Sequence, residues 1–230
     1  QRAYDNVIHD VAIQGLPVVM CLDRGGLVGE DGVTHHGVFD MAAFGAVPGL
    51  TIAAPMNEPE LRNMMYTALG SGHPFMIRYP RGHGEGLPWR GEKFEALPVG
   101  RGRRLREGDD VALVSVGTVG NAAARAAERA AAEGVNAAHY DLRFVKPLDE
   151  ALLDEVGRKF RRVVTVEDGA LRGGVGEAVA AFFNDRGYDV RVHRLGIGDE
   201  WVEHGTPGQL YALCGYDEEG ILRALLDTRA

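Results

Sequence analysis

The chain has 230 residues, of which 45% are hydrophobic and 25% charged, an ordinary composition for a folded globular protein with a substantial core. Its formal net charge is −8 and no basic stripe is visible, which argues against a nucleic-acid surface; an anionic ligand would need a local cluster of arginines. The longest purely apolar runs span only a few residues, which is too short for a membrane-spanning helix.

The first predicted element is a helix near the start of the chain. Neither a capping residue nor a methionine precedes it, and no signal peptide is visible. From this pattern we expect Gln1 to lie in the middle of a larger protein. The apolar residues that follow the spacing of one helix face are Tyr4, Val7, Ile8, Val11 and Ala12.

The rest of the first block alternates strands with a helix. The predicted strands cover residues 17–23, 50–54 and 74–79. Asn57, with an acidic residue three positions later, has the pattern of a helix cap, and the helix it begins ends near Gly70. A glycine-rich loop occupies residues 24–37, directly after the first strand.

Residues 83–97 are rich in glycine, proline and charge, so we place a linker there, between domains at 1–82 and 98–230. The second domain repeats the alternation. Its predicted strands cover residues 111–116, 137–142, 162–166 and 190–195, and its helices begin near Asn121, Asp149, Gly174 and Asp217. The alternation predicts an α/β fold with two parallel-sheet domains and helices on both faces of each sheet.

The two cysteines, Cys21 and Cys214, are far apart in the sequence, and each lies in or beside an apolar stretch. They do not form a Cys-x-x-Cys pair, so the sequence gives no case for a zinc site or a redox pair. We predict two buried, reduced thiols, which fits a cytosolic protein.

The loop at residues 24–37 is the first candidate for a binding site. Open parallel sheets bind ligands beyond the carboxyl ends of their strands, and this loop follows such an end. Its glycines let the backbone approach a ligand closely. It also carries Arg24, Asp31, Thr34 and His35, which are groups that bind anions and move protons.

The third predicted strand also ends in arginines, Arg78 and Arg81. Two strand ends with arginines predict a site for a phosphorylated or carboxylated small molecule, because a guanidinium makes paired hydrogen bonds to such groups. His35 could act as a general acid or base, with Asp31 as its partner or as a second polar contact. Equally, His35 could be solvated or structural, and the two arginines could form salt bridges at the strand end.

Three other features have structural interpretations. His36 is interpreted as a bystander, and metal ligation by two adjacent histidines lacks a supporting acidic cluster. Residues 172–176 miss the G-x-G-x-x-G pattern, so close packing of a helix on a strand is predicted there. The basic run of Arg101, Arg103, Arg104 and Arg106 is interpreted as a solvated strand edge.

Several strings resemble the 1-deoxy-D-xylulose-5-phosphate synthases. The most specific are Asp-Gly-Val-Thr-His-His-Gly-Val-Phe-Asp at residues 31–40 and Arg-Tyr-Pro-Arg-Gly at residues 78–82, supported by residues 1–5 and 23–29. The resemblance covers essentially the whole chain. Looser matches, shared with transketolases and with the beta subunits of 2-oxoacid dehydrogenases, continue at residues 143–149, 166–168 and 173–176.

This resemblance implies an enzyme that uses thiamine diphosphate and Mg²⁺ to decarboxylate pyruvate and to add the two-carbon unit to D-glyceraldehyde 3-phosphate. The product would feed the non-mevalonate isoprenoid pathway and the synthesis of thiamine and pyridoxal. The family's enzymes are cytoplasmic homodimers of three-domain chains. Residues 1–82 would be part of the pyrimidine-binding domain, incomplete at its N-terminus, and residues 98–230 the transketolase C-terminal domain, mostly structural and part of the dimer interface.

Carried over by position, the resemblance assigns Arg2, Arg24 and Arg81 to the phosphate of the acceptor substrate. It assigns Asp31 and His35 to the reacting centre as catalytic residues. For Arg78 it implies no firm role.

Two motifs of the family have no match in this chain: the Gly-Asp-Gly and Asn motif for diphosphate and magnesium, and the Ala-Glu-Gln-His motif with the activating glutamate. We therefore expect the chain alone neither to bind thiamine diphosphate tightly nor to turn over. A missing N-terminal part of the enzyme would be its physical partner, because an open sheet edge needs one. The alternatives are another transketolase-like enzyme (a 2-oxoacid dehydrogenase beta subunit or a transketolase C-terminal half) and a non-catalytic anion-binding module.

Overall fold

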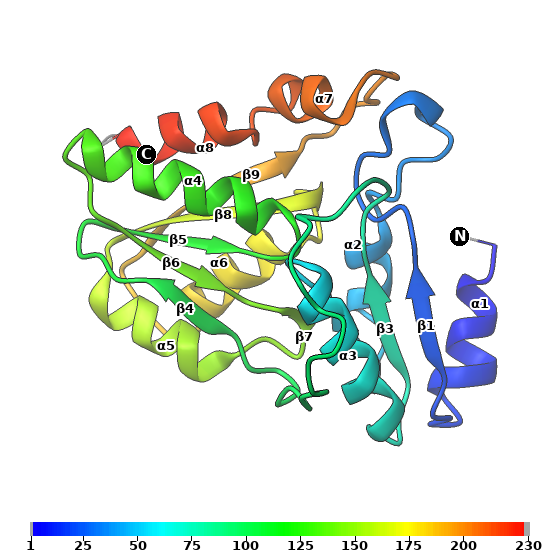
Figure 1. Cartoon of the computed structure of the whole chain (residues 1–230). Coiled ribbons are helices and arrows are strands. Elements are labelled where there is room, and N and C mark those ends of the chain that lie inside the picture. Colours follow the sequence, from blue (N-terminus) through cyan, green and yellow to red (C-terminus); the bar gives the residue numbers. More distant parts are fainter. Residues whose placement is uncertain (1, 228–230) are drawn as a thin grey trace.

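The computed structural model describes residues 2–227 and contains two sheets that lie side by side, each with helices on both faces (Figure 1). We call residues 2–82 the N-terminal block and residues 98–227 the C-terminal block. The predicted α/β class, with two mainly parallel sheets, is confirmed. Residues 83–97 contain neither helix nor strand, and the division into domains at that segment stays a prediction.

The first sheet has four strands in the order β1-β3-β2-β7. Their bounds are β1 Val19–Leu22, β2 Thr51–Ala53, β3 Phe75–Arg78 and β7 Phe144–Lys146. The first three are parallel, as predicted, whereas β7 runs antiparallel to β2. The sequence did not predict β7, which comes from the C-terminal block. The two blocks therefore share the first sheet.

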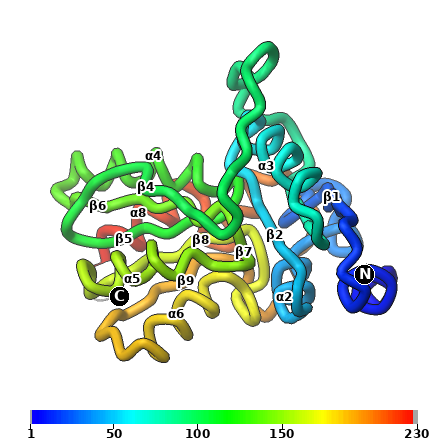
Figure 2. The backbone as a smooth tube through the Cα atoms, turned by 90° about the horizontal axis from the view of Figure 1, so that it is seen from below, coloured from blue at the N-terminus to red at the C-terminus, as the bar shows by residue number. Residues whose placement is uncertain are grey.

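The helices of the N-terminal block cover both faces of this sheet, as Figure 2 shows for α2 and α3. They are α1 Tyr4–Asn6, continued by the π-helix η1 Val7–Ala12, the 3-10 turn η2 Gly29–Asp31, α2 Asp40–Gly45 and α3 Glu58–Gly70. Asn57 caps α3 as predicted, since its Oδ1 accepts the Glu60 amide at 3.1 Å. The predicted opening helix is confirmed, but most of it has the wider π turn.

The second sheet has five strands in the order β4-β6-β5-β8-β9. Their bounds are β4 Arg103–Arg106, β5 Val111–Ser115, β6 Ala137–Asp141, β8 Arg162–Ala170 and β9 Arg191–Ile197. All neighbours are parallel except β4, which runs antiparallel to β6. The basic run thus contains an edge strand, as the sequence predicted.

Helices α4 and α8 cover one face of the second sheet, and α5 and α6 cover the other (Figures 1 and 2). The bounds are α4 Val119–Ala132, α5 Glu150–Lys159, α6 Val175–Asp185, α7 Pro207–Leu213 and α8 Glu218–Leu226. Asp149 and Asp217 cap α5 and α8 by accepting main-chain amides at 3.1 and 2.9 Å. Helix α7 was not predicted. None of the helices within residues 2–227 is long and apolar enough to cross a membrane.

Close packing of a helix on a strand explains the glycines at residues 172–176, as predicted. The Glu167 carboxylate accepts the amides of Val175 and Gly176, both at 2.8 Å, at the N-terminus of α6. A Cβ at Gly176 would lie 3.2 Å from that carboxylate and closer still to the Thr165 hydroxyl. Glycine is therefore needed because β8 and α6 approach each other closely.

The prediction for the cysteines is wrong for Cys21. Both thiols are free, but Cys21 is exposed and Cys214 is only partly buried. Cys21 lies on β1, which is an edge strand with one hydrogen-bonded neighbour. An apolar strand was interpreted as buried on all sides, whereas its place at the edge leaves this side chain accessible.

A buried ion cluster joins the two blocks, and the sequence did not predict it. Glu60 of α3 lies 2.6 Å from Nε of Arg143 and 2.8 Å from Nη2 of Arg103. Arg103 also contacts Asp141 at 3.0 Å. The basic run was interpreted as solvated, but Arg103 turns inward because two buried carboxylates lie behind the edge strand.

Candidate functional site

Three main-chain hydrogen bonds hold the neck of the loop at residues 24–37, by which we mean Gly25, Gly26 and Gly37. Gly26 and Gly37 exchange main-chain bonds of 2.8 Å in both directions, and the Gly25 amide donates to the Tyr79 carbonyl at 2.9 Å. Gly26 has φ +82°, and a Cβ at Gly37 would overlap the Arg24 carbonyl oxygen. The glycines thus let two arms of one loop lie against each other without side chains between them.

Arg78 lies beneath this neck and is structural. Only 5% of it is exposed, its Nε donates to Asp40 at 2.7 Å and its Nη2 donates to the Asp168 carbonyl at 2.9 Å. Burial alone would lower the pKa of Arg78, but the charges of Asp40 and Asp168 outweigh that effect and raise its pKa. Of the alternatives left open by the sequence, the structure supports the salt bridge for Arg78.

Asp168 follows Glu167 near the end of β8 and is buried below the loop. Its Oδ1 accepts the Leu27 amide at 3.1 Å and the Tyr216 hydroxyl at 2.7 Å, and its Oδ2 accepts the Tyr211 hydroxyl at 3.4 Å. Burial raises the pKa of Asp168, and the nearby Arg78 charge opposes that rise. The carboxylate therefore connects the loop to the C-terminal block.

Two arginines at strand ends converge on one carboxylate. Asp31, in the turn η2, places Oδ2 2.6 Å from Nη1 of Arg81 and 3.8 Å from Nε of Arg24. Both arginine side chains are 44% exposed and Asp31 is 31% exposed. Arg24 has a left-handed backbone with φ +59°, directly after β1. These three residues, which the sequence selected, lie together at the open end of the first sheet.

The two adjacent histidines have different surroundings. His35 is exposed, and its Nδ1 lies 2.9 Å from the Thr34 hydroxyl. His36 is only 9% exposed; its Nδ1 accepts the Val28 amide at 3.1 Å and its Nε2 lies 3.1 Å from the Val202 carbonyl. These partners assign His36 the neutral form with the proton on Nε2. His36 thus holds the loop in place, and His35 is the histidine open to a ligand.

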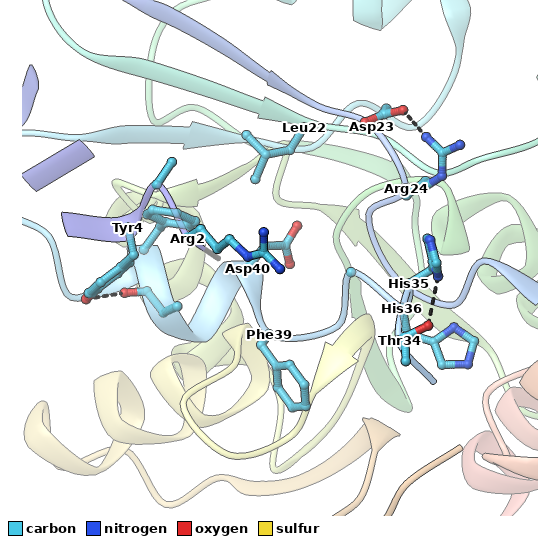
Figure 3. A pocket seen from close by; sticks show the side chains of 14 residues that line it. Arg2, Tyr4, Leu22, Asp23, Arg24, Thr34, His35, His36, Phe39 and Asp40 are labelled. Carbon is cyan, nitrogen blue, oxygen red and sulfur yellow. Dashed lines mark hydrogen bonds and ion pairs between the residues drawn. The ribbon is translucent and has the colours of Figure 1, made fainter. Parts of the chain in front are cut away.

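A cavity of about 870 Å³ lies next to the loop (Figure 3). Figure 3 shows Arg2 and Tyr4 on one side of it and Arg24, Thr34 and His35 on the other. The Tyr4 hydroxyl donates to the Ala43 carbonyl at 3.1 Å, which fixes this aromatic wall. The cavity therefore combines cations and a histidine with a largely apolar lining.

The structure does not place all predicted site residues in this cavity. Arg2, Arg24 and His35 line it, whereas Arg81 lines a second hollow of about 550 Å³ between the blocks. Asp31 joins the two places, because it contacts both Arg24 and Arg81. Within residues 2–227, no group of three or more His, Cys, Asp or Glu side chains is arranged to hold a metal ion.

Sequence reasoning missed the residues below the loop, namely Asp40, Asp168 and Tyr216. A signal existed for Asp168, because it lies near the carboxyl end of a predicted parallel strand, where such sheets bind ligands. Asp40 and Tyr216 lie in no comparable sequence position, and only the fold brings them to the loop.

Comparison with known proteins places the chain among transketolase-type proteins. The model of the transketolase C-terminal domain matches residues 100–221, and that of the transketolase pyrimidine-binding domain matches residues 1–85. The 1-deoxy-D-xylulose-5-phosphate synthase of Bacteroides fragilis is 58% identical over 100% of this chain and 36% of its own length. The synthase of Aquifex aeolicus is 45% identical over 99% of this chain and 36% of its own length.

Among solved structures, a split-gene transketolase in an inactive beta4 tetramer is similar, with a TM-score of 0.84 and 27% identity. The match covers 97% of this chain and 70% of that protein. The two curated synthases are much longer, and this chain spans about a third of their length.

Proposed function

Since the chain belongs to the transketolase family, we propose that it is the C-terminal portion of a 1-deoxy-D-xylulose-5-phosphate synthase that depends on thiamine diphosphate. The complete enzyme would decarboxylate pyruvate and join the two-carbon unit to D-glyceraldehyde 3-phosphate. The high identity to two such synthases along nearly the whole chain supports this assignment.

The observation that carries the proposal is the convergence of Arg24 and Arg81 on Asp31 beside His35. Two guanidinium groups that share one carboxylate oxygen have the arrangement needed for a phosphate, which offers several acceptor oxygens. In the proposed complex the acceptor's phosphate takes the place of the Asp31 carboxylate between the arginines. Arg2 supplies a further cation from the opposite side of the cavity.

His35 and Asp31 are the proposed catalytic residues. The Thr34 hydroxyl pairs with Nδ1 of His35, which leaves Nε2 for the acceptor. From there His35 donates a proton to the carbonyl oxygen of the acceptor as the new carbon–carbon bond forms. Asp31, released from the arginines by the phosphate, accepts a hydrogen bond from an acceptor hydroxyl.

The cavity fits only part of the cofactor that the family implies. Thiamine diphosphate, when bound, would supply the chemistry that activates the two-carbon unit, and the apolar wall formed by Leu22, Phe39 and Phe44 would suit one of its aromatic rings. Magnesium needs oxygen ligands such as carboxylates, and within residues 2–227 no group of three or more His, Cys, Asp or Glu side chains is arranged to hold it. In this proposal the remainder of the enzyme supplies them.

The edge of the first sheet supports a partner for this chain. Cys21 on β1 is exposed, and so are Ile13 (70%) and Val18 (37%) just before the strand. An edge strand with one free side, preceded by exposed apolar side chains, favours pairing with a further segment. We propose that the remainder of the synthase covers this edge. We also propose that the complete enzyme is a cytoplasmic homodimer, as the resemblance implies.

The test compares the 230-residue chain with the same chain joined to an N-terminal part from a relative. The chain alone should form no 1-deoxy-D-xylulose 5-phosphate, and the complete enzyme should form it. Arg81→Lys should raise KM for D-glyceraldehyde 3-phosphate about tenfold and leave KM for pyruvate unchanged, because lysine cannot make the paired bonds. Arg101→Lys, in the Arg101–Asp149 pair of the C-terminal block, is the control.

Two results would contradict parts of this proposal. Product formation by the isolated chain would show that catalysis does not need a further N-terminal part. An inactive complete enzyme would contradict the synthase assignment. The likeness to a split-gene transketolase favours a second candidate, a transketolase half. Transfer of a two-carbon unit from a ketose phosphate, without pyruvate, would select that function instead.

A further inference from the structure

We propose that Asp168 of the C-terminal block is a positioning residue for the anion site. It holds the neck of the loop at residues 24–37 and so fixes where Arg24 and His35 lie. The role of those two residues rests on the proposed function, whereas the positioning itself rests on geometry alone.

Asp168 contacts the loop directly through its side chain, and its main chain supports the loop through Arg78. Its Oδ1 accepts the Leu27 amide at 3.1 Å, and a Cβ at Gly26 would overlap its carboxylate. Its carbonyl accepts Nη2 of Arg78 at 2.9 Å. The guanidinium of Arg78 would in turn lie 3.1 Å from a Cβ at Gly25. The neck therefore rests directly on the Asp168–Arg78 pair.

The position of this carboxylate is fixed from the other side by tyrosines. Tyr216 is 1% exposed and donates to Oδ1 at 2.7 Å, and Tyr211 donates to Oδ2 at 3.4 Å. A buried carboxylate that loses a hydrogen bond costs free energy, so Asp168 favours the loop conformation that supplies the Leu27 amide. The loop geometry thus depends on residues around α7 and α8.

The position of the neck determines where both arms of the loop lie, the first beginning at Arg24 and the second ending at Gly37. Arg24 directly precedes Gly25, and His35 lies two residues before Gly37, which pairs with Gly26. A shift of the neck therefore moves Arg24 and His35 together. The second arm has its own bond to the C-terminal block, through His36 and the Val202 carbonyl. Both arms of an anion site in the N-terminal block are thus held by the C-terminal block.

The first test measures amide hydrogen exchange on the whole protein with Asp168→Ala and Asp168→Asn. We expect exchange within residues 24–37 to accelerate at least about tenfold in the alanine variant, the cost of one buried hydrogen bond. The asparagine variant should stay near wild type, because its amide oxygen can still accept from Leu27 and Tyr216. Strands β5 and β6, which do not contain the substituted residue, should be unchanged in both.

Two further variants make this test specific. Tyr216→Phe removes one hydroxyl without changing the shape of the side chain and should accelerate loop exchange severalfold. This variant tests the proposal if Asp168→Ala fails to fold. Tyr188→Phe is the matched control, because its hydroxyl bonds Asp154 at 2.9 Å within the C-terminal block and away from the loop. Unchanged loop exchange in both Asp168→Ala and Tyr216→Phe overturns the proposal, as does equal acceleration of the loop and the two reference strands.

The second test separates the positioning role from the proposed function. In the complete enzyme, Asp168→Ala should raise KM for D-glyceraldehyde 3-phosphate about tenfold with KM for pyruvate unchanged, a split that a general loss of stability would not produce. If the wild-type enzyme makes no product, the synthase assignment fails, yet loop exchange still decides the role of Asp168. If activity is present and both loop exchange and KM are unchanged, only the positioning role fails.

Discussion

Asp31 and Arg81 form an ion pair of 2.6 Å between Oδ2 and Nη1, and the same oxygen lies 3.8 Å from Nε of Arg24. A carboxylate of the chain itself thus lies between the arginines proposed to bind phosphate. An incoming anion must compete with Asp31 at Arg81 and also with Asp23, which lies 2.5 Å from Nη1 of Arg24. The affinity of this site for anions therefore depends on these carboxylates as well as on the arginines.

We expect Asp31→Asn to bind inorganic phosphate about threefold to tenfold more tightly than wild type. The substitution removes the competing negative charge, and the effect is modest because these side chains are partly exposed and screened. Isothermal titration calorimetry at low salt measures it. The control is Asp189→Asn, which breaks the exposed Arg161–Asp189 pair elsewhere. Weaker binding would show instead that Asp31 holds the arginines ready for the anion.

Glu60→Gln should lower the free energy of unfolding by about 3 kcal/mol, because it removes the carboxylate paired with the largely buried Arg143 and leaves Arg103 with Asp141 alone. Glu60 is 4% exposed and lies within 2.8 Å of both Arg103 and Arg143. Urea denaturation measures the change. Glu150→Gln, in the exposed Arg186–Glu150 pair, should cost less than about 1 kcal/mol. Equal costs for the two variants would contradict a stabilising role for the buried cluster.

His139 should contribute a loss of stability as the pH drops from 6.5 toward 4. Burial lowers the pKa of His139 from 6.5 to about 4, with Arg103 and Arg106 adding to the effect. In that window the unfolded chain binds a proton that the folded chain does not, so acid favours unfolding. The contribution of His139 should amount to about 3 kcal/mol across the window.

Unfolding experiments at several pH values with His139→Gln check this prediction. The variant should lose the slope that His139 adds, and the exposed His83→Gln is the control. Burial and the nearby Glu60 raise the pKa of Asp141 to about 6, which acts in the opposite direction. Because Asp141 is present in all three proteins, the difference between them isolates His139. Parallel pH profiles would mean that folding does not lower the pKa of His139.

Iodoacetamide should modify Cys21 much faster than Cys214 at pH 8. Cys21 is exposed, whereas burial raises the pKa of the Cys214 thiol from 9.0 to about 11. That rise lowers the reactive thiolate fraction of Cys214 about 100-fold. Peptide mass spectrometry gives the two rates, and Cys21→Ser identifies the fast site. Similar rates at the two cysteines would contradict the placement of β1 at the sheet edge.

Gly37→Ala should lower the free energy of unfolding by about 2 kcal/mol, because its Cβ would overlap the Arg24 carbonyl and force the loop neck apart. Gly45→Ala is the matched control, since a Cβ there has open space at the end of α2. Thermal unfolding of the two variants measures the difference. If Gly37→Ala left the free energy of unfolding unchanged, the neck would be looser than its paired 2.8 Å bonds indicate.

Much of the fold and part of the candidate site followed from local sequence patterns. The cap at Asn57 and the helix starts near Asp149 and Asp217 could be predicted because each of these side chains bonds an amide three residues away. The loop after β1 could be selected because glycines and charged residues follow an apolar strand. Such features depend on neighbours within one turn of helix or one strand, which the sequence states directly.

The tertiary structure alone decided which distant segments meet. The place of β7 in the first sheet, the exposure of Cys21 and the inward turn of Arg103 depend on strand order. Asp168 lies 141 residues from the Leu27 amide that it accepts. The partners of a buried charge are set by the fold and not by distance along the chain, because only the folded core removes the charge from water and makes those contacts necessary.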